Sequence, residues 1–420
     1  MVEIRKPDIG PGNVIYINGT PYYVFRGLTR IGHPGETIRS ATLWRDIDAP
    51  DTPIAGFKVS DNNVCYCFYD NPDELHILTE DVIGGILTFH SSVSLISPDG
   101  TVKEYSQQFT LDRTYKIEGV NRIDGFHSFF GIEHGLLRDD KDRIFIWRNE
   151  KDINECYQLP GSELYHLSYH RERGFPSFDF FFVLTDEGLF GYKYREDDKV
   201  PGYLSSNDIG SNRYFNIYNL PLPEGIEPNN IKNMANLDIS SMYLLTDEGR
   251  VYSIGETTYY QRGTAKKLKV DEWNEIKYPE KIIDIGAVYN KPGVFALSEN
   301  GNLYYHGYNE KNYYPITNRK SSIGKPLKIA TGIQALWVPH SDIFSYMDNS
   351  PYIQIPPVFV VNDRNELVLI PTNETLQNKN KKEFIIDSSN KVYTPGIYKR
   401  LNKDLAFTPA MLKSLVLYSC

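Results

Sequence analysis

The sequence contains few cysteines, which excludes a fold built on a disulfide framework. Only four occur in 420 residues, at Cys65, Cys67, Cys156 and Cys420. Cys65 and Cys67 share one face of an expected strand, a geometry in which two cysteines do not easily bridge each other. We therefore expect free, buried thiols and a reducing compartment.

The sequence also has no block of basic residues and no long apolar run. Its formal net charge is −9, its pI is about 5.6, and its densest basic stretch is Lys266, Lys267 and Lys269. A nucleic-acid-binding chain needs a row of cations along the phosphate backbone, so these three lysines indicate a solvated loop. No apolar run reaches membrane-spanning length, and residues 1–12 are polar and rich in proline and glycine. The expected location is the cytoplasm or a virus particle, without secretion through a classical signal peptide.

No stretch matches a catalytic, phosphate-binding or dinucleotide-binding fingerprint. His166 and His170 stand four residues apart, but Leu167 occupies the position where a zinc protease carries glutamate. Both histidines lie in a segment that reads as strand and loop, so we expect structural roles for them. The aspartates within 46–51 lack the glycine and glutamate of a calcium loop. The sequence predicts no enzyme activity, no cofactor and no metal.

What the sequence does contain is one short phrase, repeated seven times. The copies are VSDNNV at 59–64, ISPDGTV at 96–102, LRDDKDRIF at 137–145, LTDEGLF at 184–190, LTDEGRVY at 245–252, LSENGNLY at 297–304 and VNDRNELV at 361–368. In the copy at 245–252 an apolar strand ends at Thr246, Asp247 and Glu248 begin a turn, and Gly249 closes it. Glycine in four copies and asparagine in two suit the positive φ of such a turn. Each copy therefore predicts a β-hairpin.

The repeat spacing indicates how these hairpins combine. The mean interval is about 50 residues, which accommodates four short strands and their loops. Residues 281–309, KIIDIGAVYNKPGVFALSENGNLYYHGYN, resemble the repeat of the regulator of chromosome condensation family. That repeat has an inner strand ending near glycine, a small-apolar strand, a Leu-Ser/Thr-x-x-Gly turn and an aromatic strand ending in Gly-x-Asn. Residues 231–256 match less fully and 329–370 weakly.

The resemblance implies an all-β fold, a seven-bladed β-propeller of four-stranded antiparallel blades. The alternative is a β-sandwich array with similar turns. We expect one propeller over residues 1–404. The hairpins at 14–25 and 384–393 would share its closing blade, or the first would belong to a separate cap over residues 1–50.

The last residues, 405–420, differ from the rest. Thr408 and Pro409 are suited to the start of a helix, and a short apolar helical tail is expected after them. The tail either folds back onto the propeller or docks on a partner. Its candidate contact residues are Met411, Leu412, Leu415 and Val416.

Three stretches read as exposed insertions: 195–213, 256–272 and 304–320. Recognition often occurs in long loops on a rigid scaffold. The third is dense in tyrosine and asparagine, and Tyr313 and Tyr314 are its candidate contacts for a protein or a glycan.

The primary hypothesis for function is a non-enzymatic protein–protein interaction scaffold, in particular a structural component of a virus or bacteriophage tail, neck or fibre. The alternatives are a receptor- or glycan-binding propeller and an exchange factor for a small GTPase. The founding member of the resembled family is a guanine-nucleotide exchange factor that docks on chromatin. No basic arm or GTPase wedge is recognisable here, and the four tryptophans are scattered, unlike those of the plant ultraviolet receptors. Those specialised activities do not transfer.

Overall fold

A computed structural model of the chain describes residues 4–5, 14–17, 19–24, 28–43, 56–68, 74–87, 92–106, 108–128, 134–150, 153–172, 178–194, 204, 208–211, 215–238, 241–288, 293–310, 314, 317–319, 321–338, 358–364 and 367–370. These residues form strands and their connections, and a turn of 3-10 helix, η1, lies at Pro228–Asn230. They fall into two compact units. One comprises residues 5–164 and 185–187, and the other comprises residues 1–4, 165–184 and 188–420.

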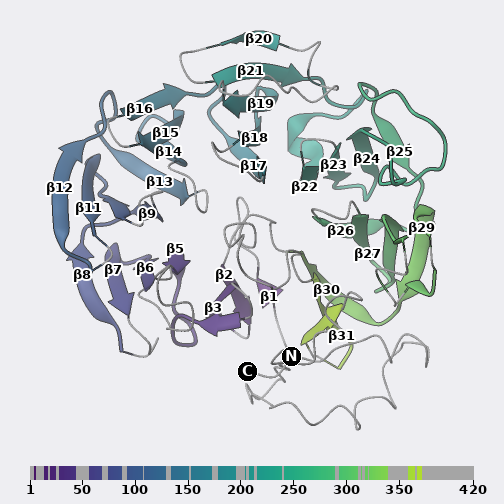
Figure 1. Cartoon of the computed structure of the whole chain (residues 1–420), viewed down its shortest axis with the longest axis horizontal. Helices are drawn as coiled ribbons and strands as arrows, with labels where there is room; N and C mark the ends of the chain where they lie inside the picture. The colour runs from purple at the N-terminus through teal and green to yellow at the C-terminus, as the bar shows by residue number, and fades with distance from the viewer. Residues whose placement is uncertain are drawn as a thin grey trace. The chain divides into compact units, whose positions relative to one another are not determined.

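The unit of residues 5–164 contains four antiparallel sheets, each with four strands (Figure 1). In hydrogen-bonded order the sheets are β1 (Ile4–Arg5), β2 (Val14–Ile17), β3 (Thr20–Val24), β4 (Leu28–Arg30); β5 (Ile38–Leu43), β6 (Gly56–Ser60), β7 (Val64–Phe68), β8 (His76–Glu80); β9 (Gly84–Leu87), β10 (Val93–Ile96), β11 (Thr101–Tyr105), β12 (Leu111–Lys116); and β13 (Ile123–Ser128), β14 (His134–Asp139), β15 (Ile144–Glu150), β16 (Ile153–Gln158). The first strands β5, β9 and β13 contact one another in succession.

The other unit repeats the pattern. Its sheets are β17 (Leu164–Glu172), β18 (Phe178–Thr185), β19 (Gly188–Tyr194), β21 (Phe215–Leu220), β20 (Asp208–Ser211); β22 (Ile231–Asp238), β23 (Ser241–Thr246), β24 (Val251–Gly255), β25 (Asn274–Ile276); β26 (Ile282–Val288), β27 (Gly293–Ser298), β28 (Leu303–Gly307), β29 (Ile323–Ala330); and β30 (Ile333–Trp337), β31 (Val358–Asn362), β32 (Leu367–Ile370). Here β22, β26 and β30 are the first strands in succession, and each contacts the next.

Each of the seven repeat copies forms a hairpin, and the strands on either side of its turn are neighbours in one sheet. Antiparallel sheets that follow one another along the chain, with neighbouring first strands, are the blades of a β-propeller. The all-β propeller class and its seven repeat-bearing blades are thus as predicted. The sheet of β1–β4 lacks the repeat but contains the predicted Asn-Gly hairpin, with Gly19 at φ +73°.

The repeat's polar residue before the turn explains why the phrase recurs. It is buried in all seven copies, as Ser60, Ser97, Asp139, Thr185, Thr246, Ser298 and Asn362. In two copies the hydroxyl accepts a backbone N–H from beyond the turn: Arg250 N–H donates to Thr246 Oγ1 at 3.2 Å, and Asn302 N–H donates to Ser298 Oγ at 3.1 Å. A buried hydroxyl that satisfies the turn avoids the cost of an unpaired polar group.

The turn also joins successive sheets. The Gly249 carbonyl accepts the N–H of Ile282, which begins β26, and the Gly301 carbonyl accepts the N–H of Ile333, which begins β30. A Cβ at Gly249 would lie 2.3 Å from the Lys281 side chain, and Gly249 has φ +82°. Only glycine meets both conditions at low cost. The recurring motif therefore connects each of these sheets to the next through its turn.

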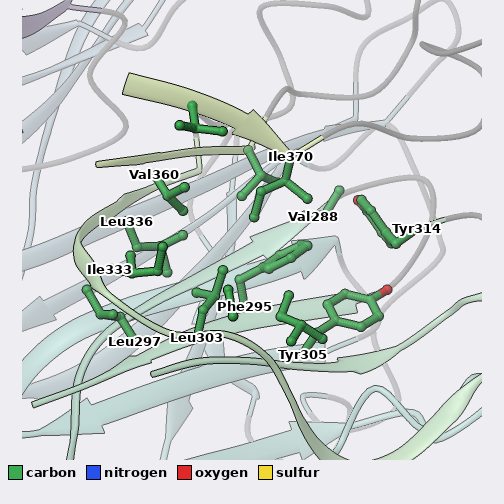
Figure 2. Close-up of a cluster of buried hydrophobic side chains, with 14 residues drawn as sticks. Val288, Phe295, Leu297, Leu303, Tyr305, Tyr314, Ile333, Leu336, Val360 and Ile370 are labelled. Atoms are coloured by element: carbon green, nitrogen blue, oxygen red, sulfur yellow. The ribbon is translucent and has the colours of Figure 1, made fainter. Parts of the chain in front are cut away.

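The core lies between neighbouring sheets. Figure 2 shows one cluster, in which Leu297, Leu303 and Tyr305 of the β26–β29 sheet pack against Leu336 and Val360 of the β30–β32 sheet. Burying one such aliphatic side chain contributes about 1.5–3 kcal/mol.

Three expectations are settled only in part. The insertion at 195–213 is not simply an exposed loop, since Leu204 is fully buried and β20 adds an edge strand to its sheet. The hairpin at 384–393 and the tail at 405–420, with its predicted helix, lie outside the described residues. The closing blade and the domain limits therefore stay predictions.

Candidate interaction surface

Two long loops in neighbouring sheets lie against each other. One joins β24 to β25 and the other joins β28 to β29, so both connect the third strand of a blade with the fourth. The Tyr259 and Tyr308 rings meet edge to face, with centroids 5.2 Å apart. A Cβ at Gly324 would lie 3.1 Å from the Cβ of Ala265, so glycine permits the close backbone approach there. The structure thus joins the predicted insertions at 256–272 and 304–320.

Arg262 holds the first loop from inside. Its side chain is fully buried and donates to four backbone carbonyls. One nitrogen, Nη1, reaches Gly255 at 3.0 Å and Lys269 at 2.6 Å, while Nη2 reaches Ser253 at 3.0 Å and also Glu272. Burial lowers the pKa of the guanidinium to about 10, yet the group stays charged at neutral pH. The loop is therefore closed around a buried cation.

Asn309 holds the second loop from its entrance. Its Nδ2 donates to Thr317 Oγ1 and to the Arg319 carbonyl, both at 2.7 Å, and its Oδ1 accepts the Tyr314 N–H at 2.7 Å. This residue is the asparagine of the Gly-x-Asn signature at 307–309. The signature thus encodes a fixed loop and not a binding group.

A buried histidine lies beneath the two loops. His306 Nε2 is 2.9 Å from the Tyr278 hydroxyl, and the ring also lies beside Tyr243, whose hydroxyl donates to the Gln261 carbonyl at 2.9 Å. Burial lowers the pKa of His306 to about 3, so the imidazole is neutral at physiological pH. It supports the loops and is not accessible to a substrate.

Tyr260 is the exposed tyrosine next to Tyr259 in the loop between β24 and β25. Its side chain is 39% exposed and its backbone has φ +60°, a left-handed conformation that is uncommon for an aromatic residue. The local fold retains this strain, and such strain is concentrated at functional sites. We call Tyr259, Tyr260 and Tyr308 the two-loop surface. Aromatic rings on a rigid support bury large contact areas at little entropic cost, so this surface is suited to binding.

The structure corrects one predicted contact residue. Tyr314 was expected in an exposed loop, but its side chain is fully buried and packs on Phe295 and Tyr305, with centroids 5.3 and 5.0 Å apart. It anchors the loop to the core and is not available on the surface. Tyr313 and the tail residues Met411, Leu412, Leu415 and Val416 lie outside the described residues.

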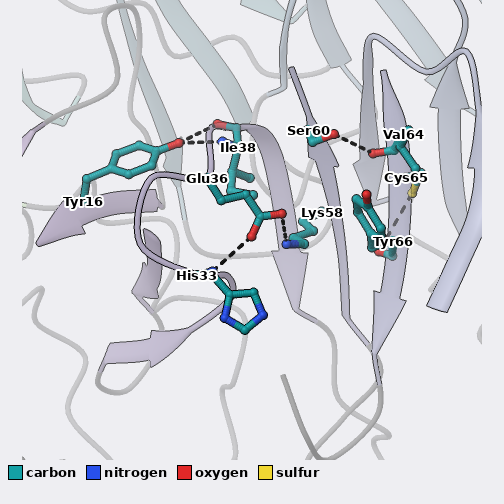
Figure 3. A network of polar contacts seen from close by, with 9 residues as sticks. All are labelled: Tyr16, His33, Glu36, Ile38, Lys58, Ser60, Val64, Cys65 and Tyr66. Atoms are coloured by element: carbon teal, nitrogen blue, oxygen red, sulfur yellow. Dashed lines mark hydrogen bonds and ion pairs between the residues drawn. The ribbon is translucent and has the colours of Figure 1, made fainter. Parts of the chain in front are cut away.

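A second polar network lies in the unit of residues 5–164 (Figure 3). The buried Lys58 ammonium pairs with Glu36 and lies 5.0 Å from the centre of the Tyr66 ring. Burial lowers the pKa of Lys58, and the Glu36 carboxylate opposes this shift. The neighbouring Tyr16 hydroxyl accepts the Ile38 N–H at 2.7 Å. Because Lys58 is enclosed, we interpret the network as joining β2, β5 and β6.

Other candidates have structural roles. His166 Nε2 lies 3.0 Å from the Ile231 carbonyl and its pKa is lowered by burial, as expected of a structural histidine. Cys65 and Cys67 are free and buried, and burial raises the pKa of Cys156 to about 12. Within the described ranges, no three His, Cys, Asp or Glu side chains are grouped to hold a metal ion. No helix in those ranges is long and apolar enough to span a membrane.

Comparison with known proteins found no matching family model and no matching curated protein. Among solved structures, the chain is similar to yeast RCC1 (Prp20) bound to Kap60. The identity is 12%, the TM-score is 0.41, and the match covers 68% of this chain and 76% of that one. It is similar to human WBSCR16 at 14% identity and TM-score 0.39, covering 61% and 64%. It is also similar to the WD40 repeats of RRP9 at 10% identity and TM-score 0.38, covering 82% and 96%. At these identities and TM-scores the similarities carry no conclusion about function.

Proposed function

We propose that this chain is a non-enzymatic protein–protein interaction scaffold that contacts its partner through the two-loop surface. The observation that carries the proposal is Tyr260, an exposed ring in a left-handed backbone conformation on a loop closed around Arg262. A rigid loop loses little conformational entropy on binding, so more of the contact energy appears as affinity.

The strongly perturbed groups of the same unit support a binding role. His306 is buried under the loops, and Arg262 is used in holding one of them. The Glu280 carboxylate accepts hydrogen bonds from Ser298, Asn302 and Tyr304, which lower its pKa to about 2. Perturbed pKa values accompany catalysis when the group faces a cleft. Here the perturbed side chains form hydrogen bonds that hold the loops and turns in place.

Capture of the partner with matched variants tests the proposal. The full chain carries a photo-crosslinking residue at position 260 in one preparation and at position 111 in another. Leu111 is 50% exposed on β12, so it is a comparably accessible apolar control. Crosslinking of one protein species through position 260, lost on competition with unmodified chain but not with the Tyr260→Ala variant, supports the proposal. Equal crosslinking from both positions contradicts it.

A glycan-binding function is the second candidate, because exposed tyrosine rings also stack on sugars. It predicts glycan-array binding that disappears in Tyr260→Ala and persists in Leu111→Ala. Absence of glycan binding on the array, together with protein crosslinking at position 260, favours the protein-interaction scaffold over the glycan-binding function.

Two finer hypotheses stay predictions. A structural role in a virus or bacteriophage particle predicts that the native protein co-purifies with particles. An exchange-factor role predicts accelerated nucleotide release from a small GTPase. The cytoplasmic or virion location is likewise a proposal, which cell fractionation tests.

A further inference from the structure

We propose that the two-loop surface recognises an acidic segment of a protein partner. The inference rests on the proposed function and adds the chemistry of the partner. The groups that carry it are five exposed cations beside the tyrosines, which we call the cationic margin: Lys266, Lys267, Arg319, Lys325 and Lys328.

The fold brings these cations together from separate parts of the sequence. Ala265 lies against Gly324, and each is followed directly by a lysine of the margin, Lys266 and Lys325. Lys328 lies three residues further along the same outer strand, β29. The Arg319 carbonyl accepts Asn309 Nδ2, which places Arg319 close to Tyr308. A basic edge thus adjoins the aromatic rings.

These charges are not neutralised within the part of the chain that the structure describes. None of the five side chains forms an ion pair there. By contrast, Lys269 pairs with Glu272 and Lys277 pairs with Glu275, both at 2.5 Å. The whole chain has net charge −9, whereas the five residues of the margin are all cations. Uncompensated charge at a contact surface steers an oppositely charged partner and sets its register.

An acidic protein segment fits better than a nucleic acid. A long polyanion would extend beyond the margin, where a net negative chain repels it over roughly the Debye length of ~10 Å. Single-stranded nucleic acid also needs free aromatic faces for successive bases, whereas Tyr259 is already packed edge to face on Tyr308. A short segment with carboxylates and one apolar side chain would satisfy both the lysines and Tyr260.

Binding of a short fluorescent poly-glutamate peptide carrying one leucine tests the inference by fluorescence anisotropy on the full chain. The double charge reversal Lys266→Glu with Lys325→Glu is compared with Lys141→Glu with Lys232→Glu. The control pair changes the net charge equally at exposed lysines elsewhere. We expect about tenfold weaker binding for the margin variant and little change for the control.

The remaining outcomes decide the inference. The inference is supported if peptide affinity falls with rising salt concentration in chains with an intact margin but not in the margin variant. Equal affinities of the two variants, absence of peptide binding, or tighter binding of a single-stranded oligonucleotide overturns it. If crosslinking through position 260 survives the margin reversal, the proposed scaffold stands and only the acidic partner is wrong. If that crosslinking is absent from the start, the proposed function itself has failed.

Discussion

The two loops of the candidate surface occupy equivalent places in neighbouring blades but are held differently. The loop after β24 closes around the guanidinium of Arg262, and the loop after β28 is fixed at its entrance by the amide of Asn309. A guanidinium has five donors and no acceptor, so it suits a ring of carbonyls, whereas an amide both donates and accepts. The first device puts a charge in the interior, where losing its partners is expensive. We therefore expect the loop that presents Tyr260 to lose its structure as a whole when the buried cation is removed. The other loop is expected to tolerate the loss of its amide better.

The largest expected effect comes from removing the buried cation. Arg262→Met leaves four carbonyls without their donor, and we expect a loss of about 3–5 kcal/mol in the free energy of unfolding. Hydrogen exchange should accelerate in residues 256–272. Chemical denaturation and exchange mass spectrometry provide the measurements. Arg262→Lys, which retains charge but not the fork, should also lose most of this stability. A fully stable methionine variant would show that the carbonyls do not need the guanidinium.

The matching change in the second loop should cost less. Asn309→Ala removes three hydrogen bonds of a neutral amide, and we expect about 1–3 kcal/mol of destabilisation. Exchange should rise around Thr317 while residues 256–263 keep their protection. Asn309→Asp serves as the control, because it preserves the acceptor for the Tyr314 N–H but has no donor. If hydrogen exchange accelerates in both loops of the Asn309→Ala variant, the two loops form one cooperative element. The proposed difference between the ways the two loops are held would then be wrong.

Acid should destabilise the support shared by the two loops. The folded pKa of His306 is about 3, below the ordinary 6.5, so the unfolded chain binds the extra proton between these values. Stability is then lost as pH falls from about 6.5 towards 3, at up to ~1.4 kcal/mol per pH unit. The Glu280 carboxylate contributes in the same direction at lower pH, since its pKa is depressed to about 2 and its stabilisation is lost progressively as the pH falls from about 4.5 to about 2. Unfolding curves at several pH values provide the measurement. His306→Gln should reduce the pH dependence of the unfolding free energy in the upper part of this pH range, and Glu280→Gln should reduce it in the lower part. Identical pH profiles for the two variants would contradict the assignment of the two ranges to these residues.

The sequence predicts local chemistry here better than it predicts burial. The turn at Asp247–Gly249 and its buried Thr246 could be foreseen, because turn type and residue type are linked over a few positions. Arg262 could not, since an arginine in a polar loop reads as solvated until the carbonyls of β24 surround it. Tyr314 was missed for the same reason, as only the packed sheet reveals that its ring points inward. Asn309 carried a signal, the Gly-x-Asn ending of its strand, whose meaning is structural.

The smallest effect on stability separates strain from recognition at Tyr260. Glycine adopts φ +60° without the penalty of about 1–2 kcal/mol that a Cβ incurs. Because glycine has more conformational freedom in the unfolded chain, ordering it costs about 0.5–1 kcal/mol more than ordering alanine. Tyr260→Gly should therefore be more stable than Tyr260→Ala by roughly 0.5 kcal/mol, although both lack the ring. Parallel denaturation of the two variants gives the stability difference, and competition for the crosslinked partner gives the binding loss. A glycine variant that is less stable than the alanine variant would show that the left-handed backbone is unstrained.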